Sequence, residues 1–332
     1  MRRLLPAALV FLALGPLPGA ALRFPVPDLS QQASAHRLAV APQTAGTMRF
    51  VRGWHLTSPN SRFGGFSGLA MPAPDRFELV SDSGWSASFT LGASDRLDDV
   101  HVAPLPRPRG HPQGKSSTDA ESLFVDKNSG TMWIGLEGIN QIWRLGPDFS
   151  RYEGRRALPH RPAWPINSGP EALTRLADGR TLVFSESADH DPRGGEALLY
   201  PGDPVADDRP PLRFFYDRQD KGELSDAAIL PDGRVLLIHR KLGIAPFFTT
   251  IVALLDPADI RADGVVRSTQ IGRVPKALAD NFEGAAIAVA DGRTWLWLVS
   301  DDNYNNWQRS LLLQFELVGL PPRRPDSKKA AR

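Results

Sequence analysis

Short apolar segments separated by polar turns recur along most of the chain. Five of them open with a polar or acidic residue and then a small residue before the apolar run: Phe66–Ala70, Ala120–Phe124, Pro170–Thr174, Leu224–Ala228 and Phe282–Ala286. A short turn comes next in each case: Pro74-Asp75, Asn128-Ser129-Gly130, Asp178-Gly179, Asp232-Gly233 and Asp291-Gly292. A second apolar run follows the turn: Phe77–Val80, Met132–Ile134, Leu182–Phe184, Val235–Ile238 and Trp295–Val299. An Asp-Gly pair between apolar runs favours a hairpin, because Gly adopts positive φ without steric cost. The pattern therefore predicts five β-hairpins.

The hairpins recur at a nearly constant spacing. Their opening positions, 67, 121, 171, 225 and 283, are separated by 54, 50, 54 and 58 residues. Each interval has room for two more strands, such as Gln141–Leu145 with Tyr152–Leu158, and Thr249–Leu255 with Val265–Ile271. Four short strands per period of about 50 residues are typical of a β-propeller blade. Because no segment shows a sustained helical period, we predict an all-β propeller with few helices.

The ends of the repeat indicate how many blades there are. The fifth hairpin continues into a third strand at Ser310–Leu317, after which the chain runs into a polar tail. Its outer strand can come from Met48–Trp54, which precedes the first hairpin. A ring closed in this way hides edge strands that would otherwise invite aggregation. We therefore expect five blades; the alternative is six, with a degenerate blade formed from residues 24–47 and 187–222.

The two chain ends differ in composition from the body. Residues 1–21 combine Arg2 and Arg3, an apolar run over Leu4–Leu17 and the small residues Gly19-Ala20-Ala21. This order is typical of a secretory signal cleaved near Ala21, so we expect a periplasmic or secreted protein; an uncleaved membrane anchor is the alternative. Residues 22–320 then form one propeller domain without stable membrane insertion, and residues 321–332 a disordered basic tail.

Net charge and cysteine content exclude several functions. The chain carries +2 overall, but the signal contributes +2 and the tail +4, so residues 22–320 carry about −4. A body that is mildly acidic does not predict nucleic-acid binding, and we expect a small-molecule ligand instead. The absence of Cys excludes disulfides, thiolate catalysis and Cys-ligated metal sites. The sequence leaves the oligomeric state open.

Acidic residues recur at two positions of the hairpins. The start of the first strand and the end of the second lie at the same edge of an antiparallel hairpin. If the first strand lines the channel, one mouth gathers these residues: Asp82, Glu121, Glu137, Glu171, Glu186, Asp226, Glu283 and Asp301, with Arg240 among them. So many carboxylates cannot all ionise close together without a counter-charge, and Ca²⁺ is a suitable one because it takes six to eight oxygen ligands. The alternative is that these residues cap turns and bond neighbouring blades.

Other motifs contribute less. Asp301–Asn306 begins like an EF-hand loop, but Asn306 and Leu312 replace the Gly and Glu that the loop requires; a partial calcium loop and ordinary turns both remain open. No G-x-S-x-G elbow is present, which disfavours a serine esterase. Most tryptophans are expected between blades. Trp85 and Trp307 follow the acidic strand ends, so lining of the mouth is the alternative for these two.

Several motifs in order resemble a known family. They are Phe66-Ser67-Gly68-Leu69, Ser81-Asp82-Ser83-Gly84, Asp119-Ala120-Glu121, Asn167–Leu173, Asn281-Phe282-Glu283-Gly284 and Ser300–Tyr304. Together they are similar to the bacterial "esterase-like activity of phytase" family, over roughly residues 64–317. The resemblance implies a secreted propeller that hydrolyses phosphoesters or esters. The family's fourth unit commonly ends in an acidic residue followed by Arg, whereas this chain has His239-Arg240.

A mechanism can be proposed if the protein is a metal-assisted hydrolase. Phosphoryl transfer depends mainly on positioning and on cancelling negative charge. We expect Ca²⁺ to be held by a carboxylate set: Asp82, Glu121, Glu171, Glu283 and Asp301. Arg240 and Lys241 are expected to clamp the phosphate, with His239 beside them as a further substrate-binding residue, and Glu186 or Asp226 to act as the general base. The alternative function is a non-catalytic propeller that binds a small ligand, a carbohydrate or a protein at the same mouth.

Overall fold

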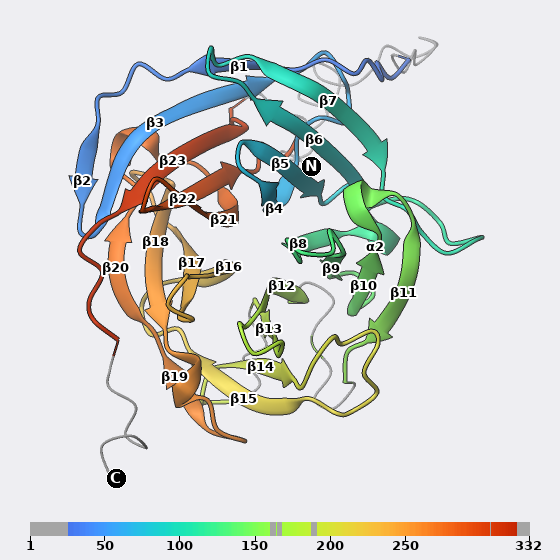
Figure 1. Ribbon diagram of the computed structural model, residues 1–332, viewed down its shortest axis with the longest axis vertical. Coiled ribbons are helices and arrows are strands. Elements are labelled where there is room, and N and C mark those ends of the chain that lie inside the picture. Colours follow the sequence, from blue (N-terminus) through green and yellow to red (C-terminus); the bar gives the residue numbers. More distant parts are fainter. Residues whose placement is uncertain (1–25, 160–163, 165–167, 187–190, 306, 324–332) are drawn as a thin grey trace, which may run out of the picture.

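Five sheets surround a common axis in the computed structural model (Figure 1). The structure describes residues 26–159, 164, 168–186, 191–305 and 307–323. The expected signal at 1–21 and most of the expected tail lie outside this part, as does Asn167. Within it, no helix is long and apolar enough to cross a bilayer. The all-β propeller with five blades is confirmed.

The blades follow one another along the chain. Blade 1 consists of β4 (Phe66–Ala73), β5 (Arg76–Ser81), β6 (Trp85–Leu91) and β7 (Leu97–Pro104). Blade 2 consists of β8 (Ala120–Val125), β9 (Met132–Leu136), β10 (Gln141–Leu145) and β11 (Tyr152–Ala157). Blade 3 consists of β12 (Pro170–Arg175), β13 (Thr181–Ser185), β14 (Gly195–Tyr200) and β15 (Leu212–Asp217), with β19 (Val265–Arg267) at its outer edge. Blade 4 consists of β16 (Glu223–Ile229), β17 (Val235–Leu242), β18 (Phe248–Leu255) and β20 (Thr269–Arg273).

Blade 5 joins the two ends of the described chain. It consists of β21 (Phe282–Ala290), β22 (Arg293–Ser300), β23 (Leu311–Leu317) and β3 (Met48–Thr57), and β3 also pairs with β1 (Ser34–Arg37) and β2 (Gln43–Ala45). The antiparallel pairing of β3 with β23 confirms the expected closure by the N-terminal segment. The alternative with six blades is wrong, because β1 and β2 extend blade 5 while β14 and β15 belong to blade 3.

One expected strand serves two blades. Residues 265–271 are divided between β19, which pairs parallel with β15 of blade 3, and β20, which pairs antiparallel with β18 of blade 4. The described helices are short: α2 (Lys115–Thr118), η1 (Pro147–Phe149), η2 (Pro257–Asp259) and η3 (Lys276–Leu278). The connection between β18 and β20 thus covers the outer edge of the preceding blade, which protects that edge from pairing with another chain.

Apolar residues are buried between the blades. Five clusters of buried side chains each combine residues of two adjacent blades. Trp54 and Trp297 of blade 5 stack with ring centroids 5.8 Å apart, and Phe77 of blade 1 meets Trp297 edge-on at 4.9 Å. Such pairs bury large apolar areas and add directional preference. These tryptophans therefore hold neighbouring blades together, as expected.

A β-bulge lies at the same place in every blade. The register between the first and second strands skips one residue on the inner strand each time: Ser67, Glu121, Glu171, Ser225 and Glu283. A bulge bends its strand and re-aims the side chain of the extra residue. These positions coincide with the hairpin openings at 67, 121, 171, 225 and 283, so the repeat in the sequence is a repeat of bulges.

The residue after the bulge connects its blade to the next one. Ser122 Oγ donates to the backbone oxygen of Pro170 at 2.6 Å. At the same position of blade 4, Asp226 Oδ2 accepts from the backbone N of Ala285 at 2.6 Å, and Oδ1 accepts from Ala227 N at 2.7 Å. Because Asp226 is fully buried, these two N–H groups depend on its carboxylate.

Glycine occupies the same position in blades 1 and 5. A Cβ atom on Gly68 would lie 3.0 Å from the backbone N of Leu123, and one on Gly284 would lie 2.9 Å from the backbone N of Leu69. These distances are too short for a side chain, so the inner strands of adjacent blades approach closely at these points. The size of the residue after each bulge thereby limits how closely the inner strands of adjacent blades approach.

Asp226→Asn tests this role of the inner strands. The amide can replace only one of the two acceptor oxygens, and its NH₂ group then faces a backbone donor. We expect a loss of about 1–3 kcal/mol in the free energy of unfolding, measured by urea unfolding. The control is Asp99→Asn, at an exposed residue with φ 51°, where Asn is well tolerated. Equal stability of the two variants would contradict the proposed role.

Candidate functional site

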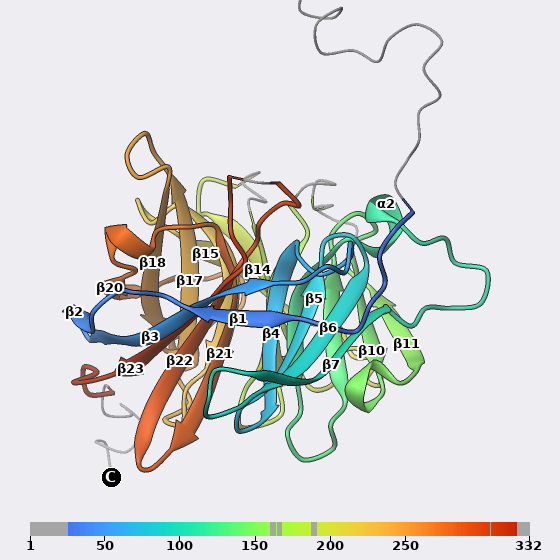
Figure 2. The ribbon, with the colours of Figure 1, turned by 90° about the horizontal axis from the view of Figure 1, so that it is seen from above.

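Two rings of residues face one end of the propeller axis. The first contains the three acidic bulged residues of the inner strands, Glu121, Glu171 and Glu283. In each blade, the residue before the bulge pairs with a residue near the end of the second strand. The second ring contains the residue directly after this paired residue: Asp82, Glu137, Glu186, Arg240 and Asp301. The connection between β22 and β23 and the helix α2 project at the same end (Figure 2). Both rings arise from the same hairpin geometry, repeated in all five blades.

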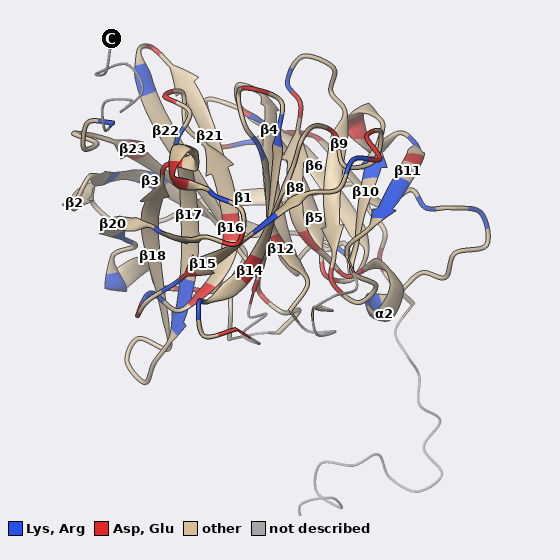
Figure 3. Cartoon of the chain, turned by 90° about the horizontal axis from the view of Figure 1, so that it is seen from below, with Lys and Arg blue, Asp and Glu red and all other residues tan. Residues whose placement is uncertain are grey.

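The rings enclose a cavity of about 240 Å³ at this mouth. Its lining consists of Asp82, Lys115, Glu121, Glu137, Glu171, Glu186, Arg240, Glu283, Asp301 and Asn303. Seven of these residues are acidic and two are basic. In contrast, charges of both signs are interspersed over the blades in the side view of Figure 3. The lining is thus strongly acidic in a protein of nearly balanced charge.

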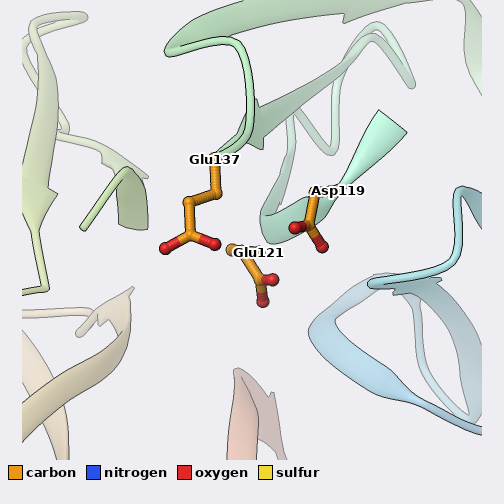
Figure 4. Close-up of side chains that lie close together, drawn as sticks. All are labelled: Asp119, Glu121 and Glu137. Carbon is orange, nitrogen blue, oxygen red and sulfur yellow. The ribbon is translucent and has the colours of Figure 1, made fainter. Parts of the chain in front are cut away.

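Two carboxylate triads lie within this acidic mouth. Asp119, Glu121 and Glu137 offer oxygens that all lie within 4.8 Å of one another, and so do Glu137, Glu171 and Glu186. Figure 4 shows the first triad pointing toward a common space. Glu137 belongs to both triads. The two sites are therefore adjacent, with one carboxylate between them.

One buried oxygen of the first triad accepts no hydrogen bond from the described residues. Asp119 is buried, and its Oδ1 atom has no hydrogen-bond partner among the described residues. Lys115 Nζ is 3.9 Å from it, beyond hydrogen-bond range. A buried carboxylate oxygen without a donor is costly, and a cation between the three carboxylates removes that cost. The oxygen-only donor set suits a hard cation such as Ca²⁺ or Mg²⁺.

Arg240 binds the carboxylates on the opposite side of the cavity. Its Nη2 atom donates to Glu186 Oε1 at 2.9 Å and lies 3.7 Å from Glu223 Oε2. Its Nη1 atom donates to Glu283 and, at 3.1 Å, to Asn281 Oδ1. The guanidinium therefore orients Glu186 and Glu283 and offsets part of their charge.

Lys115 is the second cation of the mouth, and the sequence pattern did not identify it. Its Nζ atom donates to Asp82 Oδ2 at 2.7 Å. Burial lowers the pKa of Lys115, but the hydrogen bond and charge of Asp82 outweigh burial and raise the pKa overall. The short helix α2 that carries Lys115 packs on Gly84, where φ is 77° and a Cβ atom would lie 2.0 Å from Thr118 Oγ1.

The five expected metal ligands are distributed over different partners. Glu121 and Glu171 lie in the two triads. The other three line the same cavity but bond to protein groups: Asp82 to Lys115, Glu283 to Arg240 and Asn281, and Asp301 to the backbone N of Asn303. Asp119, Glu137 and Glu186 complete the triads. Glu137 was expected at the mouth from its position in the repeat, and Asp119 stands two residues before the bulged Glu121.

Three expected site residues do not line the acidic cavity. Asp226 holds the backbone of blade 5, as described above. His239 is fully buried, and its Nε2 atom lies 2.8 Å from the hydroxyl of Tyr216 in blade 3. Lys241 is exposed and donates to the backbone oxygen of Asp220 at 3.0 Å. Asp226 and His239 each stand one position out of step with the ring residues, so strand alternation turns them away from the mouth.

In the segment after β22, the described residues of the expected partial calcium loop form turns; Asn306 lies outside the described residues. Asp302 Oδ1 accepts from the backbone N of Gly65 and Tyr304 at 2.9 and 3.0 Å. Asp302 Oδ2 accepts from Ser310 Oγ at 2.8 Å. These bonds tie the segment to blade 1. Of the two tryptophans expected at this end, Trp307 is 68% exposed, and Trp85 lies under the guanidinium of Arg62 at 5.4 Å.

Burial and mutual repulsion raise the pKa values of the mouth carboxyls. Burial, followed by the charges of neighbouring carboxylates, raises the pKa of Glu121 and Glu171 well above the usual range. The same causes raise the pKa of Glu186 to about 7 and that of Asp301 to about 8. The charged forms are therefore destabilised in the metal-free protein.

This repulsion predicts a pH-dependent stability. Glu186 and Asp301 have ordinary pKa values of 4.5 and 3.8, so near pH 7 the folded protein binds more protons than the unfolded chain. Stability then falls as the pH rises through the folded pKa values. In chelator, we expect Tm to fall between pH 6.5 and 8.5. Below that window His239 opposes the effect. Burial lowers the pKa of His239 to about 3, so its contribution to stability rises with pH up to its ordinary pKa.

Thermal unfolding with and without Ca²⁺ measures the effect. Added Ca²⁺ should raise Tm most at the high end of the window, because it binds the ionised carboxylates of the folded state. The double variant Glu186→Gln/Asp301→Asn should have a flatter profile in chelator. A Tm that is constant or rises across the window would contradict the interpretation.

The chain is similar to several solved structures and to one protein family. Similar solved structures include hydrazine synthase from Kuenenia stuttgartiensis (10% identity, TM-score 0.39, 73% of this chain and 58% of that chain). An exo-1,5-α-L-arabinanase from a bovine ruminal metagenomic library is 12% identical, with a TM-score of 0.45 over 75% of this chain and 91% of that chain. The aldose sugar dehydrogenase of Escherichia coli is 12% identical, with a TM-score of 0.46 over 76% of this chain and 96% of that chain. No curated protein sequence matches the chain. The family model described as "Esterase-like activity of phytase" matches residues 61–304, which include all the acidic residues of the mouth. The chain therefore belongs to this phytase-like family.

Proposed function

We propose that the protein is a metal-assisted hydrolase of phosphate esters that acts at the acidic mouth of the propeller. The observation that carries this proposal is the pair of carboxylate triads sharing Glu137. The buried Asp119 Oδ1 atom, which has no donor among the described residues, supports a cation in the first triad. Family membership supports hydrolysis as the reaction class.

The triads and Arg240 have different roles in this proposal. Asp119, Glu121 and Glu137 hold the cation, for which Ca²⁺ is our first candidate. When bound, the cation offsets the negative charge of the phosphate group and of the carboxylates around it. Arg240 lies across the cavity and, being a planar donor, can also bind a phosphate oxygen.

Glu186 is our candidate for the general base. Its pKa of about 7 is suited to accepting a proton near neutral pH. The 2.9 Å bond from Arg240 orients its carboxylate toward the cavity. In this role Glu186 accepts a proton from the water that attacks phosphorus, while the ester oxygen leaves. Asp226, the other candidate from the sequence, is less suitable because two backbone N–H groups occupy its oxygens.

Glu137→Gln is the sharpest test of the metal role, because Glu137 belongs to both triads. We expect calcium affinity to fall at least 10- to 100-fold, the scale seen even for residues that only support metal ligands. Phosphate release from phenyl phosphate should fall with it. Calcium binding is measured by calorimetry and hydrolysis by released phosphate. Asp208→Asn, at a fully exposed side chain of blade 3, is the control and should retain both properties.

The outcomes separate enzyme from binding protein. Full hydrolysis in chelator would contradict the metal role. Calcium binding that Glu137→Gln abolishes, without hydrolysis of any phosphate or carboxylic ester, would favour the alternative of a propeller that only binds its ligand.

Export is a second part of the proposal. The order of charged, apolar and small residues over 1–21 supports cleavage near Ala21 and a periplasmic or secreted enzyme. Expressed with its own N-terminus in a Gram-negative host, the protein should appear in the periplasmic fraction with an N-terminus at or near Leu22. An intact N-terminus in the membrane fraction would instead support the anchor.

A further inference from the structure

A second depression opens beside the acidic mouth. It has a volume of about 460 Å³ and lies between the β17–β18 connection and the segment between β22 and β23. Its apolar walls are Leu242, Phe247, Phe248 and Trp307. We call it the aromatic groove. Arg240, Glu283 and Asn303 line both the aromatic groove and the acidic cavity, so the two are continuous.

The aromatic groove exposes an unusual amount of apolar surface. Trp307 is 68% exposed, Leu242 59% and Phe247 52%. Phe247 meets Phe248 edge-on at 4.8 Å and Trp307 edge-on at 6.1 Å. These contacts orient the rings toward one another, so the exposed faces belong to one surface. Apolar surface gathered at one place beside a polar site is characteristic of ligand binding.

The polar residues of the groove are engaged with one another. Gln308 Oε1 accepts from the side-chain amides of Asn305 and Asn303 at 2.6 and 3.3 Å. Asn305 Oδ1 accepts from the backbone N of Trp307 and of Gln308 at 3.1 and 2.9 Å. A sugar or cyclitol ring needs several hydroxyl partners. Because these amides already bond within their own segment, the groove offers mainly ring faces to a ligand.

The charge of the mouth limits which anions can enter. Seven carboxylates against two cations line the adjoining cavity. A ligand with many phosphate groups meets like charge on most sides once the cation has bound a single phosphate. A ligand with one phosphate and an apolar remainder matches both parts of the site.

We propose that the aromatic groove is the subsite for the aryl group of a singly phosphorylated aryl ester, and that Trp307 determines this specificity. The assignment rests on the proposed function only for the position of the phosphate. The ester's phosphate lies in the acidic mouth near Arg240, and the aryl ring stacks on Trp307 with Phe247 and Leu242 beside it.

Trp307→Ala tests the subsite. Stacking on one aromatic face contributes enough free energy for an expected loss of about tenfold in kcat/KM for phenyl phosphate. The kcat/KM for methyl phosphate should change less than twofold. Phe247→Ala should show the same selectivity to a smaller extent. Trp295→Ala, a partly exposed tryptophan of blade 5 outside both depressions of the mouth, is the matched control and should alter neither substrate. Circular dichroism confirms that each variant is folded.

Binding of non-hydrolysable phosphonates separates the subsite from catalysis. In the presence of Ca²⁺, wild-type protein should bind phenylphosphonate about tenfold more tightly than methylphosphonate, and Trp307→Ala should remove the difference. This result in a protein that hydrolyses no ester would support the groove while the proposed function fails. Equal affinities for the two phosphonates, or no binding of phenylphosphonate, would overturn the subsite even if hydrolysis is observed. A larger effect of Trp307→Ala on glucose 6-phosphate than on phenyl phosphate would overturn the aryl assignment in favour of a sugar.

Discussion

The pairing of β3 with β23 is the constraint on which the rest of the structure depends. The sequence contains no Cys, so no disulfide can hold the ring closed, and hydrogen bonds between segments about 260 residues apart do so instead. The same pairing completes blade 5 and brings its tryptophans against blade 1. If the ring opened, the five inner strands would no longer converge. The acidic mouth exists only because the ring is closed.

The repeated bulge converts that ring into a site. Three bulged residues, Glu121, Glu171 and Glu283, and the residues at the ends of the second strands line the cavity. The residue after the bulge instead bonds the next blade, as Ser122 and Asp226 do. Two adjacent positions of the inner strand therefore differ in role: the first lines the cavity and the second bonds the next blade. Glu121 and Glu171 face the cavity, but Asp226, one position later in its own blade, bonds the backbone of blade 5. Strand alternation explains the difference.

The concentration of carboxylates at the mouth is stable only with compensation. Arg240 and Lys115 provide part of it by binding Glu186, Glu283 and Asp82. Each cation reaches only one member of a triad directly, Glu186 for Arg240 and Asp119 for Lys115. Glu137 and Glu171 therefore retain the raised pKa values that follow from burial and repulsion. In the proposed function, a cation offsets this imbalance and makes room for an anionic group. The aromatic groove then continues from this charged centre to an apolar surface, which gives the site two chemically distinct halves.

The sequence by itself determined the features that depend on local order. Short apolar runs with polar turns between them specify hairpins, and their spacing was enough to predict the five blades, the closing strand and most of the acidic lining. Only the tertiary structure decided which groups meet across blades. Lys115 reaches the mouth on a short helix without a sequence signature, the two parts of 265–271 join different blades, and Phe247 approaches Trp307 from another blade. Contacts of this kind depend on how far each blade is rotated and how closely it packs, and no local pattern of residues encodes that geometry.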